Sequence, residues 1–288
     1  MARIRNGKRK PSDRIVTGFV AATLNFCLVF QSATGFALTT SICPTQESKL
    51  FNIVGYDTIG RGAGQYSIGG SMFTKVGQGQ TSWSLDDLKI VDGGDDPYAC
   101  TIQFLQASSP RTDNDKYYYY VPRELAGDAA GWYNKLTDQP VSAAEKIIPA
   151  GNGFLVNFPV ATAKLVYSGE VQTGTDGKIY FSRSAAGSYA FLCNPVPSEV
   201  LLKNVMIVDG GDDPYACTVQ FLQSGSPRTD NDRYYYYVSR ELAGDAAGWY
   251  GKLTDLPAPA NEKIGAGEGV LVTFPVAAAK LVFDSPIK

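Results

Sequence analysis

Two acidic segments, each present twice in the chain, carry residue types that bind hard cations. The first contains Asp92, Asp95 and Asp96 beside two glycines, and the second contains Asp113 and Asp115. Carboxylate oxygens on such loops suit calcium, which takes about six to eight oxygen ligands. Aspartates also cap turns through their own backbone, and that alternative needs no metal. The corresponding aspartates of the second copy, which would also bind calcium, are Asp209, Asp212, Asp213, Asp230 and Asp232. No cofactor other than calcium is expected.

Two runs of four tyrosines, 117–120 and 234–237, form the second candidate site. Successive side chains of a strand point to opposite faces, so two tyrosines of each run point to the core and two point away. An outward pair could stack on sugar rings or contact another protein. Packing under the loop 122–131 or against a neighbouring module is the alternative. The expected ligand-binding residues are Tyr118, Tyr120, Trp132, Tyr133, Tyr235, Tyr237, Trp249 and Tyr250, with Tyr119 and Tyr236 as alternates.

The chain contains no histidine. This removes the commonest general base, the Ser-His-Asp and Cys-His arrangements, and the usual ligands of transition metals. A glycosidase could still use two carboxylates, for which Glu124, Asp128 and Glu145 are the candidates. Exposed carboxylates near turns more often serve solvation, so we expect no enzymatic activity.

The candidate residues recur because the chain is one module written twice. Residues 90–147 return without a gap at 207–264, and shorter matches extend the similarity on both sides. A repeat of this kind indicates two copies of one folding unit. We expect β-module 1 over 50–170, a connection at 171–175 and β-module 2 over 176–288, preceded by a signal peptide at 1–37 and an N-terminal segment at 38–49.

The apolar pattern within each module is that of strands. In module 1 we expect strands over 101–105, 116–121, 154–158 and 164–167, separated by turns at 108–110, 112–115 and 150–153. Short helices are predicted at 84–88 and 197–202, and the stretch 122–131 either adds another or stays a loop. The fold class is therefore mainly β, with two tandem antiparallel β-sandwich or partly open barrel modules.

The first 37 residues have the features of a cleaved signal peptide. Six basic residues precede an uncharged apolar stretch that begins at Ile15, and Gly35 and Ala37 are small residues that a signal peptidase reads. An uncleaved membrane anchor is the alternative. We expect a secreted or cell-surface protein that contacts the membrane only through this segment, if it is retained.

Removing the signal peptide leaves an acidic chain. Six of the 26 basic and one of the 28 acidic residues lie in 1–37, so 20 basic and 27 acidic residues remain, a net charge of −7. Nucleic acids and anionic membranes are bound by clustered Lys and Arg, so no nucleic-acid partner is expected.

Four cysteines remain after cleavage of the signal peptide. An even number in an exported protein favours disulfides. The equivalent positions of Cys100 and Cys217 suggest the pairs Cys43–Cys100 and Cys193–Cys217. Separate buried thiols are the alternative.

Several short motifs together resemble those of a known group of proteins. These are a Gly-x-Tyr strand, an Ile-Gln-Phe strand, a Tyr-rich strand, Gly131-Trp132-Tyr133 and the segment from Pro149 to Leu155. They resemble secreted, twice-repeated β proteins of unknown function from verrucomicrobial-type bacteria. The resemblance implies export and tandem β-modules and implies no catalytic residues. Val270 stands where the first copy has Phe154, which is a departure from the pattern.

Together these features favour an exported, non-enzymatic structural or adhesive surface protein. Its expected partners are other surface proteins or polysaccharide, and its oligomeric state is left open. A carbohydrate-binding module with exposed Tyr and Trp is the first alternative. A calcium-stabilised extracellular protein is the second alternative.

Overall fold

The computed structural model describes residues 54–60, 65–70, 73–74, 83–93, 100–106, 109–148, 152–172, 174, 176–182, 187–210 and 217–285. The chain divides into two units, Met1–Ile53 and Val54–Lys288. The predicted signal peptide, the segment 38–49 and Cys43 belong to the first unit and lie outside the described residues. The fold described below is that of the second unit, which is mainly β as predicted.

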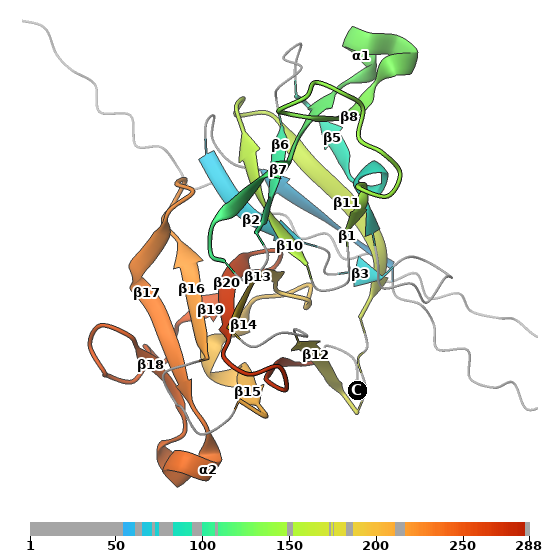
Figure 1. Ribbon diagram of the computed structural model, residues 1–288. Helices are drawn as coiled ribbons and strands as arrows, with labels where there is room; N and C mark the ends of the chain where they lie inside the picture. Colours follow the sequence, from blue (N-terminus) through green and yellow to red (C-terminus); the bar gives the residue numbers. More distant parts are fainter. Residues whose placement is uncertain are drawn as a thin grey trace, which may run out of the picture. The chain divides into compact units, whose positions relative to one another are not determined.

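Module 1 is built around a five-stranded antiparallel sheet (Figure 1). Its strands, in spatial order, are β2 (Gln65–Gly70), β10 (Gly153–Phe158), β6 (Thr101–Leu105), β7 (Thr112–Val121) and β8 (Gly131–Asn134). A second sheet holds β1 (Val54–Gly60), β11 (Lys164–Val171), β3 (Phe73–Thr74) and β5 (Lys89–Val91). A short pair joins β4 (Trp83–Ser84) to β9 (Ile147–Ile148).

The five-stranded sheet of module 2 has the same strand order as that of module 1. This sheet runs β13 (Ser188–Cys193), β20 (Gly269–Phe274), β16 (Thr218–Leu222), β17 (Thr229–Val238) and β18 (Gly248–Gly251). The smaller sheet is β12 (Lys178–Ser182), β21 (Lys280–Asp284) and β15 (Met206–Val208), and the short pair is β14 (Val200–Leu201) with β19 (Lys263–Ile264).

Each module buries its own apolar core, and a tryptophan ties the core to the backbone. Trp132 and Trp249 are 2% and 4% exposed. The Trp132 indole N–H donates to the Leu85 carbonyl at 2.8 Å, and that of Trp249 donates to the Val205 carbonyl at 2.6 Å. A buried indole needs such a partner, so this bond fixes Leu85 against β8 in module 1 and Val205 against β18 in module 2.

A third apolar cluster joins the two modules. Its buried members are Ile68, Leu155, Phe191 and Leu271, which come from β2, β10, β13 and β20. These four strands are in contact and lie together at the centre of Figure 1. Alternate residues of β10 and β20 face the core of their own module, so both faces of these two strands are buried.

The helical segments are short and differ in part from the prediction. The 84–88 prediction is met by the 3₁₀ helix η1 (Leu85–Asp87), which a capping box between Ser84 and Asp87 begins. The predicted helix 197–202 is wrong, because β14 takes Val200 and Leu201 and the 3₁₀ helix η3 covers Leu202–Asn204. The stretch 122–131 does add helix, in α1 (Arg123–Ala126) and η2 (Gly127–Ala129), with copies α2 (Arg240–Ala243) and η4 (Gly244–Ala246).

No helix in the described part of the chain is long and apolar enough to cross a membrane.

The turn predicted at 112–115 is instead a bulge inside β7. Gln103 pairs with Tyr117 whereas Leu105 pairs with Thr112, so the register shifts between these points. The Asp113 carboxylate accepts from the Asp115 backbone N–H at 3.0 Å, which is the local turn chemistry the sequence indicates. The strand continues on both sides of the bulge because β6 pairs with it there.

The predicted Cys193–Cys217 disulfide is not formed, and the described residues contain no disulfide. Cys193 pairs with Gly269 across one edge of β20. Thr218, the residue after Cys217, pairs with Thr273 across the opposite edge of β20. Two strand spacings separate β13 from β16, about 9–10 Å. A disulfide needs Cα atoms within about 7 Å. Cys100, Cys193 and Cys217 are buried in the apolar interior, and the predicted Cys43–Cys100 pair involves a residue outside the described part.

Candidate functional site

Most of the aromatic residues predicted to bind a ligand face the core. Tyr118 and Tyr235 are 2% and 3% exposed and belong to the cores of their modules. Tyr120 packs edge-on against Trp132 at 5.3 Å between ring centroids. Tyr237 packs against Trp249 in the same way at 5.1 Å. Three of these six residues line the core of each module. They do not form the exposed aromatic row that a sugar-binding surface needs.

Tyr133 and Tyr250 lie on the other face, together with Tyr119 and Tyr236. The Tyr119 ring stacks on Tyr133 at 5.7 Å and 23°. The Tyr119 hydroxyl donates to Asp138 Oδ1 at 3.2 Å, and the Tyr133 hydroxyl donates to the Ala129 carbonyl at 2.5 Å. Lys135 Nζ lies 5.2 Å from the Tyr119 centroid, within the range of a cation–π contact.

Module 2 repeats this arrangement contact for contact. Tyr236 stacks on Tyr250 at 5.7 Å and 24°, and its hydroxyl donates to Asp255 Oδ1 at 3.2 Å. The Tyr250 hydroxyl donates to the Ala246 carbonyl at 2.6 Å, and Lys252 Nζ lies 5.6 Å from the Tyr236 centroid. Asp138 and Asp255 share a left-handed backbone, with φ of 53° and 54°. The loop is therefore held in one conformation in both modules.

This rigid base presents a leucine to solvent. Leu136 and Leu253 are 60% and 68% exposed, and each follows the lysine of its loop. We call the five residues Tyr119, Tyr133, Lys135, Leu136 and Asp138, and their copies Tyr236, Tyr250, Lys252, Leu253 and Asp255, the tyrosine–leucine surface. Its tyrosine hydroxyls already donate to protein groups, and Tyr119 and Tyr236 are buried, with 7% and 4% of each exposed. The side chain that a partner can contact is therefore Leu136 or Leu253, which the loop and the two tyrosines beneath it hold in place.

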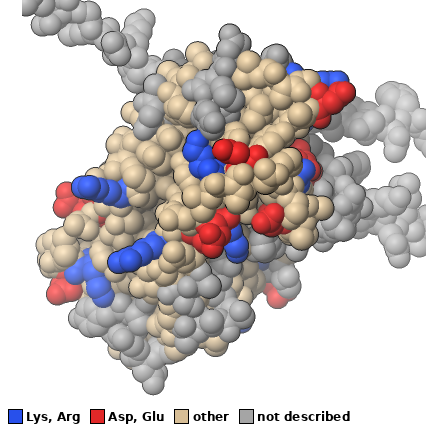
Figure 2. All heavy atoms as spheres, turned by 45° about the horizontal axis from the view of Figure 1, so that its top comes forward, with Lys and Arg blue, Asp and Glu red and all other residues tan. Residues whose placement is uncertain are grey.

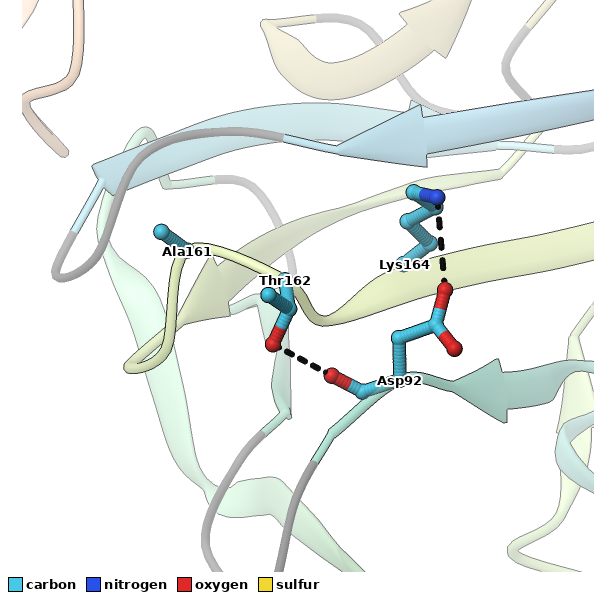
Figure 3. Close-up of a pocket in the computed structure, with 4 residues that line it drawn as sticks. All are labelled: Asp92, Ala161, Thr162 and Lys164. Atoms are coloured by element: carbon cyan, nitrogen blue, oxygen red, sulfur yellow. Dashed lines mark hydrogen bonds and ion pairs between the residues drawn. The ribbon is translucent and has the colours of Figure 1, made fainter.

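The described aspartates of the acidic segments make contacts within the protein. Asp92 Oδ2 accepts from Lys164 Nζ at 3.3 Å beside an open hollow that Ala161 and Thr162 also line (Figure 3). The Thr162 hydroxyl donates to the Asp92 carbonyl at 2.7 Å. In module 2, Asp209 pairs with Lys280 at 3.0 Å.

The acidic segments thus divide into three parts. Asp92 and Asp209 are paired with lysines, whereas Asp113 and Asp230 accept from the backbone N–H of Asp115 and Asp232 at 3.0 Å. The remaining predicted ligands, Asp95, Asp96, Asp212 and Asp213, lie outside the described residues. Within the described part, no group of three or more acidic or cysteine residues could hold a metal ion.

The surface charges are distributed as small opposite-sign groups. On the face drawn in Figure 2, blue and red residues lie close together among uncharged ones. The cross-strand pair Lys178–Asp284, at 3.3 Å, and the pair between Lys146 and Asp86 of η1, at 3.1 Å, have this character. Exposed pairs of this kind add little stability, so they chiefly set the surface potential.

The two modules differ on the core-facing side of β17. Arg233 donates to Glu262 Oε1 through Nη2 at 2.8 Å and through Nε at 3.2 Å, and its guanidinium lies 3.7 Å from the Phe221 ring centroid. The Tyr235 hydroxyl donates to Glu262 Oε2 at 2.7 Å. Burial, followed by this hydrogen bond, raises the pKa of Tyr235.

Module 1 has Lys116 and Glu145 at the positions of Arg233 and Glu262. The Glu145 carboxylate instead accepts from the Ser142 hydroxyl at 2.6 Å and from its backbone N–H at 3.1 Å. These bonds lower the pKa of Glu145. In module 2, Pro259 replaces Ser142 and frees the glutamate for Arg233. The same glutamate therefore caps a turn in one module and anchors an arginine in the other.

Sequence reasoning missed the loop residues Lys135, Leu136, Asp138 and their copies. The available signal was that residues 135–138 return unchanged at 252–255. No protein-family model matches the chain, and no curated protein matches it.

Proposed function

We propose that the protein is an exported, non-enzymatic structural or adhesive component of the cell surface that binds through its two tyrosine–leucine surfaces. The observation that carries the proposal is that one rigid surface with a protruding leucine is built by identical residues in both modules. A preformed apolar contact loses little entropy when it binds. Two equal copies raise the avidity for a repetitive partner.

The pattern of similarity between the modules supports this assignment. The residues that build the tyrosine–leucine surface are identical in the two modules, as are buried residues such as Trp132 and Trp249. The exposed Leu136 and Leu253 are thus kept alike, as two copies with the same kind of partner would require.

Adhesion to other surface proteins fits this geometry better than sugar stacking does. A sugar ring needs an open aromatic face, whereas Tyr119 and Tyr236 are each stacked against a second tyrosine. A nonpolar side chain on a fixed base is a common anchor of protein interfaces.

The first test asks whether the chain reaches the cell surface. The full chain with a C-terminal epitope tag is expressed in a bacterial host, and intact cells are treated with protease. We expect loss of the 1–37 segment and removal of the tag by external protease. A tagged chain that keeps its N-terminus and stays protected in the cytoplasm would refute export.

The second test asks whether the leucines mediate adhesion. We expect cells that display the chain to aggregate and the Leu136→Ser/Leu253→Ser variant to lose this property without a change in expression. The matched control is Ile147→Ser/Tyr180→Ser, which removes two exposed apolar side chains elsewhere. Aggregation that survives the leucine substitutions would exclude the tyrosine–leucine surface. Retention on insoluble cellulose or chitin would favour polysaccharide as the partner instead.

A further inference from the structure

The apolar cluster between the modules is symmetric in its residues. Every member has its counterpart from the other module within the same cluster. The four pairs are Tyr66 with Tyr189, Ile68 with Phe191, Leu105 with Leu222, and Leu155 with Leu271. An interface in which the same patch of both partners meets itself is isologous, as in twofold dimers.

Reciprocal close contacts show the same symmetry. A Cβ on Gly153 would stand 2.7 Å from the Phe191 carbonyl oxygen. The counterpart contact is made by Gly269, where a Cβ would overlap the Ile68 side chain. Residue 153 of module 1 thus contacts 191 of module 2, and their counterparts 269 and 68 contact each other in return. Both glycines are needed because the strands approach too closely for a side chain.

The end of β2 marks the place where the symmetry axis passes. Gly70 and Cys193 are counterparts, and they contact each other. A Cβ on Gly70 would stand 2.9 Å from Cys193 Cβ. In a twofold interface, only residues near the axis contact their own counterparts. The two modules of one chain are therefore related as the two subunits of a dimer are.

We propose that a second copy of this chain can occupy this interface, so that two chains exchange modules and form a closed dimer. Module 1 of each chain then packs on module 2 of the other through the contacts described above. The inference rests on the proposed structural role and names its assembly contact. Exchange of identical elements is a low-cost route to dimers because it creates no new interface.

The described residues of the connection between β11 and β12 are suited to act as a hinge. Gly174, Asp176 and Gly177 have φ of 69°, 53° and 71°. A Cβ on Gly174 would overlap the Lys178 carbonyl, so the turn closes only with glycine at this position. A short turn that depends on such a conformation opens when a side chain is added, and opening favours exchange.

The experiment uses full chains carrying two different affinity tags, refolded together at micromolar and at submillimolar concentration. We expect a species of twice the monomer mass that carries both tags at the higher concentration. Gly174→Val should raise its fraction about tenfold, because strain at the turn penalises the unexchanged form. The matched control is Gly187→Val, at a glycine with φ of 67° outside the connection, which should leave the fraction unchanged.

Leu271→Ser distinguishes module exchange from another surface contact. It should abolish the mixed-tag dimer, because the exchanged dimer needs the symmetric interface. A dimer that survives this substitution, or a Gly174→Val chain that folds and stays monomeric, overturns the inference. If Gly174→Val does not fold, the test uses the parent chain alone. Absence of a mixed-tag dimer of the parent chain at submillimolar concentration then overturns the inference. Surface exposure and cell aggregation are measured separately, so failure of exchange leaves the proposed function standing.

Discussion

Tyr118 is a residue whose surroundings control its protonation. It lies in the core of module 1 beside Phe104 and pairs with Ile102 on β6. Burial, with smaller contributions from Glu145 and Asp113, raises the pKa of Tyr118 from 10.0 to about 12. An apolar site disfavours the charged phenolate, whereas the unfolded chain exposes the phenol to water. The hydroxyl is therefore kept neutral by folding.

This shift predicts a loss of stability in alkali. Below pH 10 the phenol is neutral in both states, and the full stabilisation is present. Between pH 10 and about 12 the unfolded chain releases the proton while the folded chain holds it, so the free energy of unfolding falls. Chemical denaturation between pH 8 and 12 measures the slope. We expect Tyr118→Phe to be less sensitive than the parent above pH 10, and equal slopes would contradict the burial of this phenol.

At the scale of elements, the positions of the strands could be predicted from the sequence, but the face of the sheet to which each tyrosine points could not. Aromatic and β-branched residues over 101–105 and 154–158 predict β6 and β10, since such side chains fit a pleated sheet. The face of each tyrosine depends on register, and Tyr118 faces the core because it lies opposite Ile102. Neighbouring strands and the bulge at Asp113 set that register, and neither is visible in the tyrosine run itself.

β10 carried a signal for the interface between modules. Its sequence is a nearly continuous apolar run, which is typical of a strand buried on both faces. Phe154 and Val156 face the core of module 1, and Leu155 faces module 2. The sequence thus indicates a second covering layer, but it does not identify module 2 as that layer. The sequence also does not show which strands are neighbours. The predicted Cys193–Cys217 disulfide is wrong because β20 lies between β13, which contains Cys193, and β16, which follows Cys217.

The acidic turns make a prediction about calcium. A site with a Kd of about 10 μM would add about 2.7 kcal/mol of stability in about 1 mM calcium. Because Asp92 is paired with Lys164 and Asp113 bonds to the backbone, we expect the same melting temperature in calcium and in chelator. Thermal unfolding of the full chain measures this. A rise of several degrees that Asp92→Asn/Asp209→Asn abolishes would instead make these segments metal loops.

At the scale of the whole second unit, two cores are linked by one shared cluster. Each core contains its own tryptophan and its own strands, and Ile68, Leu155, Phe191 and Leu271 connect them. Burial of apolar side chains contributes about 1.5–3 kcal/mol each. The cluster is thus large enough to make the modules unfold together. A serine in place of one of these four residues removes its share of this burial and places a hydroxyl in the cluster, so it weakens the coupling between the modules.

Adjacent residues of β20 provide the test of this coupling. Leu271 faces the shared cluster, whereas Val272 is buried in the core of module 2. We expect one calorimetric transition for the parent and two for Leu271→Ser, because the two cores lose the contact that couples them. Val272→Ala should cost about 2–3 kcal/mol through lost burial and a cavity while keeping one transition. A single transition for Leu271→Ser would mean that the modules are coupled elsewhere, and two for Val272→Ala would mean that the cluster does not couple them.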